Sequence, residues 1–294
     1  MKGFGSFHPA VLLTYYITVI AFSMVTMNPV LISSSLIGAF VLYGVEFGAV
    51  TLLSDLVSYA CIFAIMTTVN PLFVHDGETP LFFMNGNAVT LEAIMYGAAS
   101  SMMIVSILVW CRCYSKYMTI DKFLYLFGKV TPKLALILSM TFRFIPLFRK
   151  QAVSIGDTQR TMGLYSRGSI KDRGLGAFRT FDSLVGWSIE KSIDTADSMK
   201  ARGYGLHGRT DYSIFMFRRR RDGKMLAFIL CVSALLAAIY MSGSIDFAFY
   251  PKLGNLETDA AAIAAYAAAA ALMLVPALTE IKEQIIWYYL KSKA

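Results

Sequence analysis

Few residues in this sequence could carry enzymatic or metal chemistry, and they are scattered along the chain. There are only three histidines, and the four cysteines fall in or beside apolar runs: Cys61, Cys111, Cys113 and Cys231. None of the cysteines has the spacing to a histidine that a zinc site needs. The sequence therefore predicts neither a metal centre nor a disulfide framework.

Glycine-containing segments give little support for nucleotide binding. Residues 203–208 spell G-x-G-x-x-G, but a dinucleotide site needs a strand before this motif and a helix after it. Here a helix precedes the motif and a basic loop follows. Gly223-Lys224 lacks the upstream glycine and the hydroxyl residue of a P-loop. We expect no cofactor on this chain and no ATP binding of the P-loop type.

Cations are concentrated near Arg218-Arg219-Arg220-Arg221, just before an apolar stretch. Such a run is most simply an anchor for lipid headgroups. Because aromatic residues are not interleaved with these cations, nucleic acid is not an expected partner.

An amphipathic helix is predicted over residues 178–201. Apolar or small residues recur at i+3 and i+4 spacing, and they are Phe178, Phe181, Val185, Ile189, Ser192, Ala196 and Met199. The helix ends in Ala201-Arg202-Gly203. Gly203 suits the left-handed position after a helix, and Arg202 places a cation at the negative end of the helix dipole. On this pattern alone, a stable helix end is the simpler interpretation.

Composition indicates a membrane protein. The chain has 294 residues, of which 56% are hydrophobic and 16% charged, and its mean hydropathy is +0.57. Soluble domains are about a quarter charged, so an ordinary soluble enzyme is excluded, as is a disordered chain. Six stretches approach the roughly 20 residues of a membrane-spanning helix, the first two being short. They cover about 11–27, 30–45, 50–70, 90–111, 225–242 and 259–278.

Charge asymmetry predicts the orientation of these spans. Residues 143–224 hold 17 Lys or Arg against 8 Asp or Glu, whereas loop 71–89 has no Lys or Arg and loop 243–258 has one. The positive-inside rule places 143–224 in the cytoplasm and both loops outside. Six spans then put both termini in the cytoplasm.

The long basic segment is too long for a structureless loop. Residues 121–150 are predicted to form interfacial helix broken at Pro132 and Pro146. The expected fold is an all-α polytopic membrane protein with about six transmembrane helices and long amphipathic cytoplasmic coupling helices. We divide it into a four-helix transmembrane region (1–115), a coupling-helix region (116–222) and a C-terminal transmembrane hairpin (223–294).

An ordered series of short motifs resembles one membrane-protein family. The series runs His8-Pro9, Asn70-Pro71, Val89-Thr90-Leu91-Glu92, Phe142-Arg143-Phe144-Ile145-Pro146, Gln159-Arg160, Ala201-Arg202-Gly203-Tyr204 and Arg209-Thr210. Together these motifs, from about residue 8 to 211, resemble the transmembrane T component (EcfT) of energy-coupling factor (ECF) ABC transporters, the cobalt-permease-like family.

This resemblance implies a non-catalytic scaffold for two ABC ATPase subunits, which bind the ATP, and for a membrane-embedded substrate-binding S component. Each coupling helix of the family ends in an x-Arg-Gly-like motif that docks on an ATPase. One end maps onto Ala201, Arg202 and Gly203. The other is expected after Arg160, at Thr161-Met162-Gly163, where Met162 replaces the arginine. Ser166-Arg167-Gly168 also has the x-Arg-Gly form, so Arg167 is an alternative.

The resemblance implies uptake of a vitamin or a transition-metal ion across a bacterial or archaeal cytoplasmic membrane. The main alternative is a polytopic membrane enzyme acting on lipid or isoprenoid substrates. Asp194 and Asp197 lie at i, i+3 but lack the Asp-rich partner segment of such an enzyme. A stand-alone permease is a third option, disfavoured because the few ionisable residues of the spans, Glu46, Asp55 and Glu92, lie near span ends and not at the membrane midplane.

Overall fold

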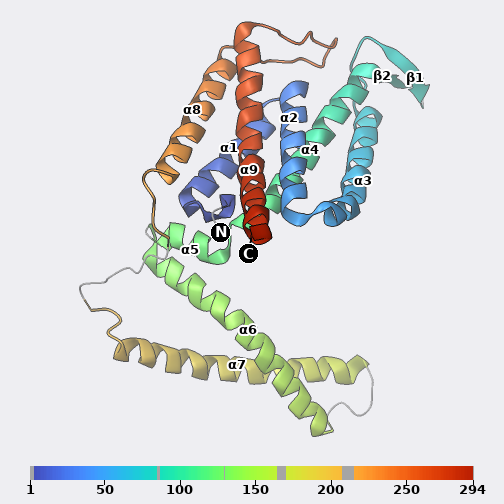
Figure 1. The fold of residues 1–294 in the computed structure, drawn as a ribbon. Helices are drawn as coiled ribbons and strands as arrows, with labels where there is room; N and C mark the ends of the chain where they lie inside the picture. The colour runs from blue at the N-terminus through green and yellow to red at the C-terminus, as the bar shows by residue number, and fades with distance from the viewer. Residues whose placement is uncertain (1–2, 85–86, 129, 164–169, 207–214, 294) are drawn as a thin grey trace. The chain divides into compact units, whose positions relative to one another are not determined.

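The structure, a computed structural model, describes residues 3–84, 87–128, 130–163, 170–206 and 215–293. In these ranges the chain forms α-helices, one short 3-10 turn and one β-hairpin (Figure 1). It divides into two compact units: unit 1 comprises Met1–Phe123 and Phe215–Ala294, and unit 2 comprises Leu124–Ile214.

The apolar stretches are helices of unit 1. Five are long and apolar enough to cross a membrane: α2 (Pro29–Phe47), α3 (Ala49–Phe73), α4 (Leu91–Tyr117), α8 (Asp222–Met241) and α9 (Ala260–Lys293). A sixth, α1 (Pro9–Val25), is apolar but has 17 residues. The predicted class, a multi-pass helical membrane protein, is confirmed. The last of these helices, α9, runs well past its predicted end at about residue 278.

Local sequence explains where several of these helices begin. His8 and Asn28 each accept a hydrogen bond from the backbone N–H two residues later, at 3.2 and 3.0 Å, and each precedes a proline in the first helical turn. Proline suits that position because the first N–H groups of a helix have no partner inside it. Thr90 caps α4 by accepting from Ala93 N–H at 3.3 Å.

The predicted stop of the third span at Asn70-Pro71 is two residues early, because α3 continues through Pro71 to Phe73. Pro71 has no N–H to donate to the Thr67 carbonyl four residues back. At this point α4 approaches closely: a Cβ on Gly97 would lie 3.0 Å from the Thr67 carbonyl oxygen. A small residue on the neighbouring helix therefore accommodates the end of α3.

The centre of unit 1 combines polar bonds with close helix packing. The Ser35 hydroxyl lies 2.7 Å from the hydroxyls of both Ser23 and Ser106, and it accepts a hydrogen bond from Trp110 Nε1 at 3.1 Å. Such bonds link helices where water is absent. Gly38 lets α2 approach α9 so closely that a Cβ there would lie 2.9 Å from Met273 Cβ.

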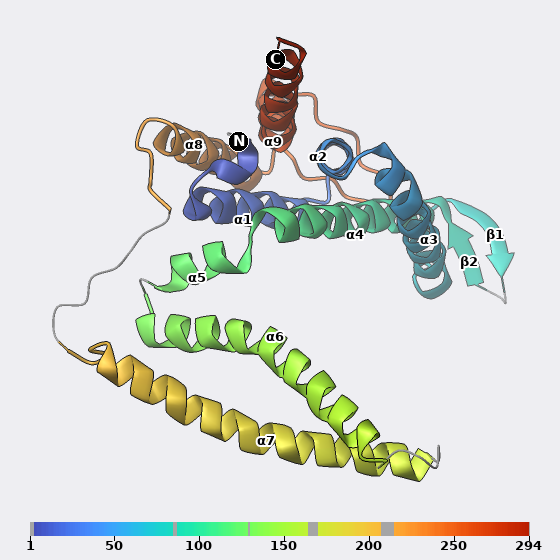
Figure 2. The same ribbon diagram turned by 60° about the horizontal axis from the view of Figure 1, so that its bottom comes forward.

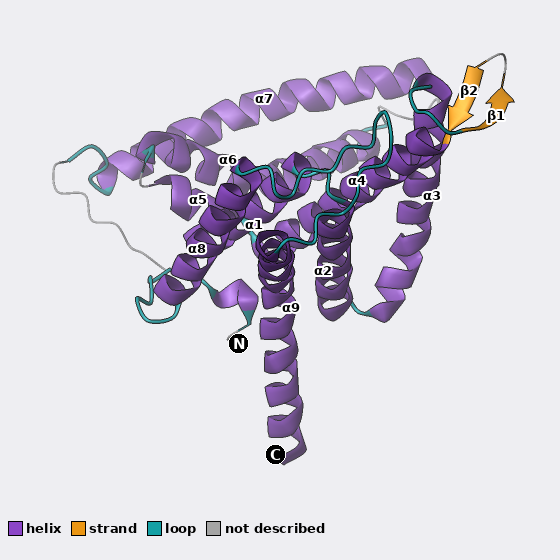
Figure 3. Cartoon of the chain, turned by 90° about the horizontal axis from the view of Figure 1, so that it is seen from above, coloured by secondary structure: helices purple, strands orange, loops and turns teal. Residues whose placement is uncertain are grey.

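A β-hairpin that the sequence analysis did not predict joins α3 to α4. Strand β1 (Pro80–Met84) pairs antiparallel with β2 (Asn87–Thr90), at the ends of α3 and α4 (Figure 3). Its base is fixed by the buried Glu92, which accepts a bond from the Thr79 hydroxyl at 2.7 Å. Asn70 Nδ2 donates to the Ala93 carbonyl at 2.8 Å. Asn70 and Glu92, two of the motif residues, thus hold this connection together.

Both acidic loops lie at the same end of unit 1. Glu78, beside the hairpin, pairs with Lys252 in the 243–258 loop at 2.8 Å. The two chain termini lie at the opposite end (Figure 1), where Lys116 pairs with Glu46 at 2.7 Å. This arrangement agrees with an even number of crossings, and the cytoplasmic side remains an expectation from the charge asymmetry.

We expect cysteine labelling to place the acidic loops outside. In a variant without its four native cysteines, Asn255→Cys should react with a membrane-impermeant maleimide on intact cells. Ser183→Cys, an exposed position of the basic segment, should react only after permeabilisation. The opposite pattern would contradict the topology.

Candidate functional site

Two long helices dominate unit 2. After the short α5 (Ile120–Gly128) come α6 (Pro132–Thr161) and α7 (Ile170–Ala201). The C-terminal half of α6 lies against α7 (Figure 2). Phe148 and Trp187 pack there, with ring centroids 5.6 Å apart, edge to face. The Thr180 hydroxyl donates to Gln159 Oε1 at 3.4 Å. The two helices therefore run antiparallel where they touch.

Pro132 and Pro146 have different effects on the course of α6. Pro132 begins α6, as predicted, but the predicted break at Pro146 is wrong, because α6 continues through it. A proline inside a helix removes one hydrogen bond and bends the helix without necessarily ending it. α6 changes direction along its length in Figure 2.

The apolar stripe predicted for residues 178–201 lies on α7, which begins eight residues earlier than predicted. Its large members are exposed in this chain, with Phe178 72% and Ile189 58% accessible. Unit 2 does not bury this face itself. A stripe of this kind needs either lipid or another protein as its partner.

The C-terminal end of α7 is a Schellman motif. Gly203 has a φ of +83°, and its N–H donates to the Lys200 carbonyl at 2.9 Å. The N–H of Tyr204 donates to the Met199 carbonyl at 3.0 Å. These two bonds fix the backbone immediately after the helix. Arg202 is the last residue before the reversal, and its side chain is exposed.

The C-terminal end of α6 has the same backbone geometry. Gly163 has a φ of +77°, and its N–H donates to the Arg160 carbonyl at 2.9 Å. Met162 is the C-cap, with its side chain 71% exposed. Met162 thus occupies in α6 the position that Arg202 occupies in α7. This correspondence supports Thr161-Met162-Gly163 as the counterpart of Ala201-Arg202-Gly203.

The remaining predicted site residues are Arg160 and Arg167. Arg160 lies two residues before its cap and pairs with the exposed Asp157 at 3.6 Å. Arg167 lies outside the described residues. The two caps are far apart, because Gln159 near the end of α6 contacts α7 at Thr180, which lies 22 residues before Arg202. At 1.5 Å per residue this part of the chain spans about 33 Å.

The site has the properties of a docking surface rather than a catalytic centre. Each end presents one side chain, a cation or a thioether, on a backbone fixed by its cap. Across the residues that the structure describes, there is no group of three or more His, Cys, Asp or Glu side chains arranged to hold a metal ion. The sequence analysis missed the contact between Phe148 and Trp187, because no local pattern pairs residues from different helices.

Comparison with known proteins agrees with the sequence motifs. Residues 8–212 match the family model CbiQ, described as cobalt transport protein. A protein of Lactobacillus helveticus (strain DPC 4571), named energy-coupling factor transporter transmembrane protein EcfT, is 30% identical over 106 residues, which cover 35% of this chain and 38% of that protein. The protein of the same name from Bacillus selenitireducens is 30% identical over 115 residues, covering 38% and 43%.

These alignments span about two fifths of the length of either relative. The family match is broader: it includes the first four spans and both long helices of unit 2, and it ends shortly after the Ala201-Arg202-Gly203 cap. Because it covers well over half of the sequence, the chain belongs to the CbiQ family of cobalt transport proteins.

Proposed function

We propose that this chain is the energy-coupling transmembrane scaffold of an ECF-type ABC importer. It carries no catalytic site of its own. It transmits the movement of two partner ABC ATPases, which bind the ATP, to a separate S component that takes up a vitamin or a transition-metal ion. In this proposal the chain lies in a bacterial or archaeal cytoplasmic membrane, with both termini in the cytoplasm.

The observation that carries the proposal is the shared geometry of the two helix ends. Met162-Gly163 and Arg202-Gly203 close their helices with the same bond from the glycine N–H to a carbonyl three residues back. Two equivalent ends at separate places on unit 2 suit two copies of an ATPase or two related ATPases. One end is then available to each.

The chemistry of Arg202 fits such a contact. A guanidinium held at a capped helix end can form paired hydrogen bonds with a carboxylate in a protein groove. Truncating one member of a buried charged pair costs about 2–5 kcal/mol. A helix lying in a groove is also a recurrent mode of protein recognition. Rigid-body movement of the ATPases would then displace α6 and α7 at their ends.

The exposed apolar faces of α6 and α7 support a membrane-embedded partner. Leu134, Ile137 and Ile145 are each more than half exposed on α6, as Phe178 and Phe181 are on α7. In the proposed complex the bilayer and the S component cover these faces. The helices would thus contact the ATPases at their ends and the substrate-binding subunit along their sides.

Co-purification tests this function. Expressed with its candidate partner genes, the tagged chain should bring down two ATPase subunits and a small hydrophobic S component. The purified chain alone should hydrolyse no ATP, because its sequence has no phosphate-binding P-loop. Hydrolysis should appear in the complete complex. Sustained hydrolysis by the isolated chain, or its purification without ATPases, would contradict the scaffold and favour an enzyme or a permease.

A further inference from the structure

A short segment at the N-terminus is anchored inside unit 1. We refer to residues 3–7, which include the 3-10 turn η1 (Phe4–Ser6), as the N-terminal turn. Phe4 is fully buried, with its ring 5.2 Å from that of Tyr15 and 5.5 Å from that of Tyr117. Packing of Phe4 therefore attaches the turn to α1 and α4, although it lies outside every α-helix.

The chain leaves unit 1 beside this turn. Lys122, two residues before unit 2 begins at Leu124, donates from Nζ to the Gly5 carbonyl at 2.7 Å and to the Tyr117 carbonyl at 2.8 Å. Partial burial lowers the pKa of the Lys122 ammonium, because the charged form loses hydration. The two carbonyls supply part of the solvation that the ammonium has lost.

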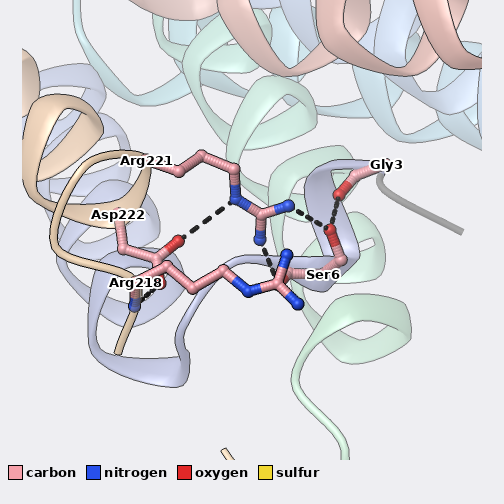
Figure 4. Close-up of polar contacts among 5 residues, drawn as sticks. All are labelled: Gly3, Ser6, Arg218, Arg221 and Asp222. Atoms are coloured by element: carbon pink, nitrogen blue, oxygen red, sulfur yellow. Dashed lines mark hydrogen bonds and ion pairs between the residues drawn. The ribbon is translucent and has the colours of Figure 1, made fainter. Parts of the chain in front are cut away.

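The chain returns to unit 1 at the same turn (Figure 4). Arg221 donates to the Ser6 carbonyl at 2.5 Å and to the Ser6 hydroxyl at 3.1 Å, and its guanidinium lies 4.5 Å from the centre of the Phe7 ring. Asp222, whose side chain is 1% exposed, accepts from Arg221 Nε at 3.4 Å and from the Arg218 backbone N–H at 2.8 Å. The guanidinium is thus held from both sides.

We propose that the N-terminal turn is a mechanical junction at which both chain connections to the coupling helices are fastened to the transmembrane helices through Lys122 and Arg221. The inference rests on the proposed function. Any displacement of unit 2 must pass through residues 123–124 and 214–215, which are its covalent links to unit 1. Lys122 lies one residue before the first link and Arg221 lies six residues after the second, and both bind the same short segment. Arg221 is therefore a positioning residue for coupling, in addition to any contact of its arginine cluster with lipid.

Matched variants separate these two roles. Arg221→Gln removes the bonds to Ser6, whereas Arg219→Gln removes the same charge from an exposed neighbour in the same cluster. Lys122→Met likewise keeps an unbranched side chain without its donors, and Lys133→Met, at an exposed position, is its control. Ser6→Ala is a milder test that removes only the hydroxyl. Each variant is made in the full chain and purified with its ATPases and S component.

Two measurements follow in reconstituted complexes. Amide hydrogen exchange in residues 4–8 should become about tenfold faster in Arg221→Gln and Lys122→Met, since each loses hydrogen bonds from a charged donor. Substrate transported per ATP hydrolysed should fall several-fold in the same variants while the ATPases still co-purify. Ser6→Ala should change both readings less, and Arg219→Gln and Lys133→Met should match the wild type.

A normal ratio of transport to hydrolysis in Arg221→Gln, despite faster exchange in the turn, would overturn the proposal and leave the cluster a purely structural contact. Equal effects of Arg219→Gln and Arg221→Gln would also overturn it, in favour of lipid anchoring. Failure of the proposed function gives a different result: ATPases would be missing from the wild-type preparation.

Discussion

Replacing Arg202 by alanine should abolish ATP-driven uptake or reduce it strongly, with partial or complete loss of an ATPase subunit from the complex. The side chain is exposed in this chain and follows a Schellman cap, so its removal leaves the fold of unit 2 intact. In the proposed complex the variant would leave a carboxylate in the ATPase groove without its partner. Such a loss costs about 2–5 kcal/mol, which is enough to release a subunit at ordinary concentrations.

Met162→Ala is the corresponding variant at the end of α6, and it is compared with Arg202→Ala. Met162 has the same place at the end of α6, but a thioether contributes packing and no ion pair. We expect a smaller loss of uptake and of ATPase retention than for Arg202→Ala. If a nearby arginine supplies the missing charge at this end, Arg160→Ala or Arg167→Ala should be nearly as damaging as Arg202→Ala.

The four variants are compared by uptake and by ATPase retention in reconstituted complexes. Circular dichroism and elution volume of each purified chain provide the control for folding. Wild-type uptake and retention in Arg202→Ala would remove the coupling role from this residue. Ala201-Arg202-Gly203 would then be only a stable helix end.

Gly38→Val should strongly destabilise unit 1. A Cβ at this position would lie 2.9 Å from Met273 Cβ and 3.2 Å from the Met273 carbonyl oxygen. The first of these atoms is the first side-chain carbon of Met273, and the second belongs to the backbone of α9. A rotamer change therefore cannot relieve the contact. Overpacking of this kind costs about 1–3 kcal/mol or more. The α2–α9 contact should loosen, and the yield of monodisperse protein should fall.

The measurement is the temperature at which half of the purified protein is lost from its size-exclusion peak after heating in detergent. Gly38→Ala should lower this temperature less than Gly38→Val does. Gly186→Val is the matched control, because a Cβ on Gly186 in α7 has no neighbouring atom within 4 Å. An unchanged midpoint in Gly38→Val would show that α2 and α9 do not approach closely at Gly38.

The membrane helices were predictable because the bilayer imposes both their length and their apolar composition. Local capping at His8-Pro9 and Asn28-Pro29 begins two of these helices, and the sequence analysis did not predict this capping. The β-hairpin was missed because only four or five residues form each strand, and its base depends on the distant pair of Thr79 and Glu92. Pro146 was misjudged because a proline inside a helix can bend it without ending it.

The candidate site was predictable only where a local sequence pattern marks a residue. Gly203 indicated a helix end through its tolerance of a positive φ, and Arg202 was identified by the motif around it. Thr161-Met162-Gly163 was expected from its place after Arg160, but the sequence left Arg167 as an alternative, and only the backbone geometry at Gly163 favours Met162. The bonds from Lys122 to Gly5 and from Arg221 to Ser6 join residues 117 and 215 positions apart, and no local pattern encodes a pairing at that separation.

The cap at Gly203 also fixes the angular phase of Arg202. Because α7 is continuous from Ile170 to Ala201, the direction in which the Arg202 side chain leaves the backbone is fixed relative to the apolar stripe. Inserting one residue into α7 would advance its tip by only about 1.5 Å but turn it by about 100°. Inserting seven would advance it by about 10.5 Å and turn it by only about 20° from its original direction. In the proposed function α7 would therefore transmit rotation about its axis as well as displacement along it, and seven-residue insertions change its length with little change of phase.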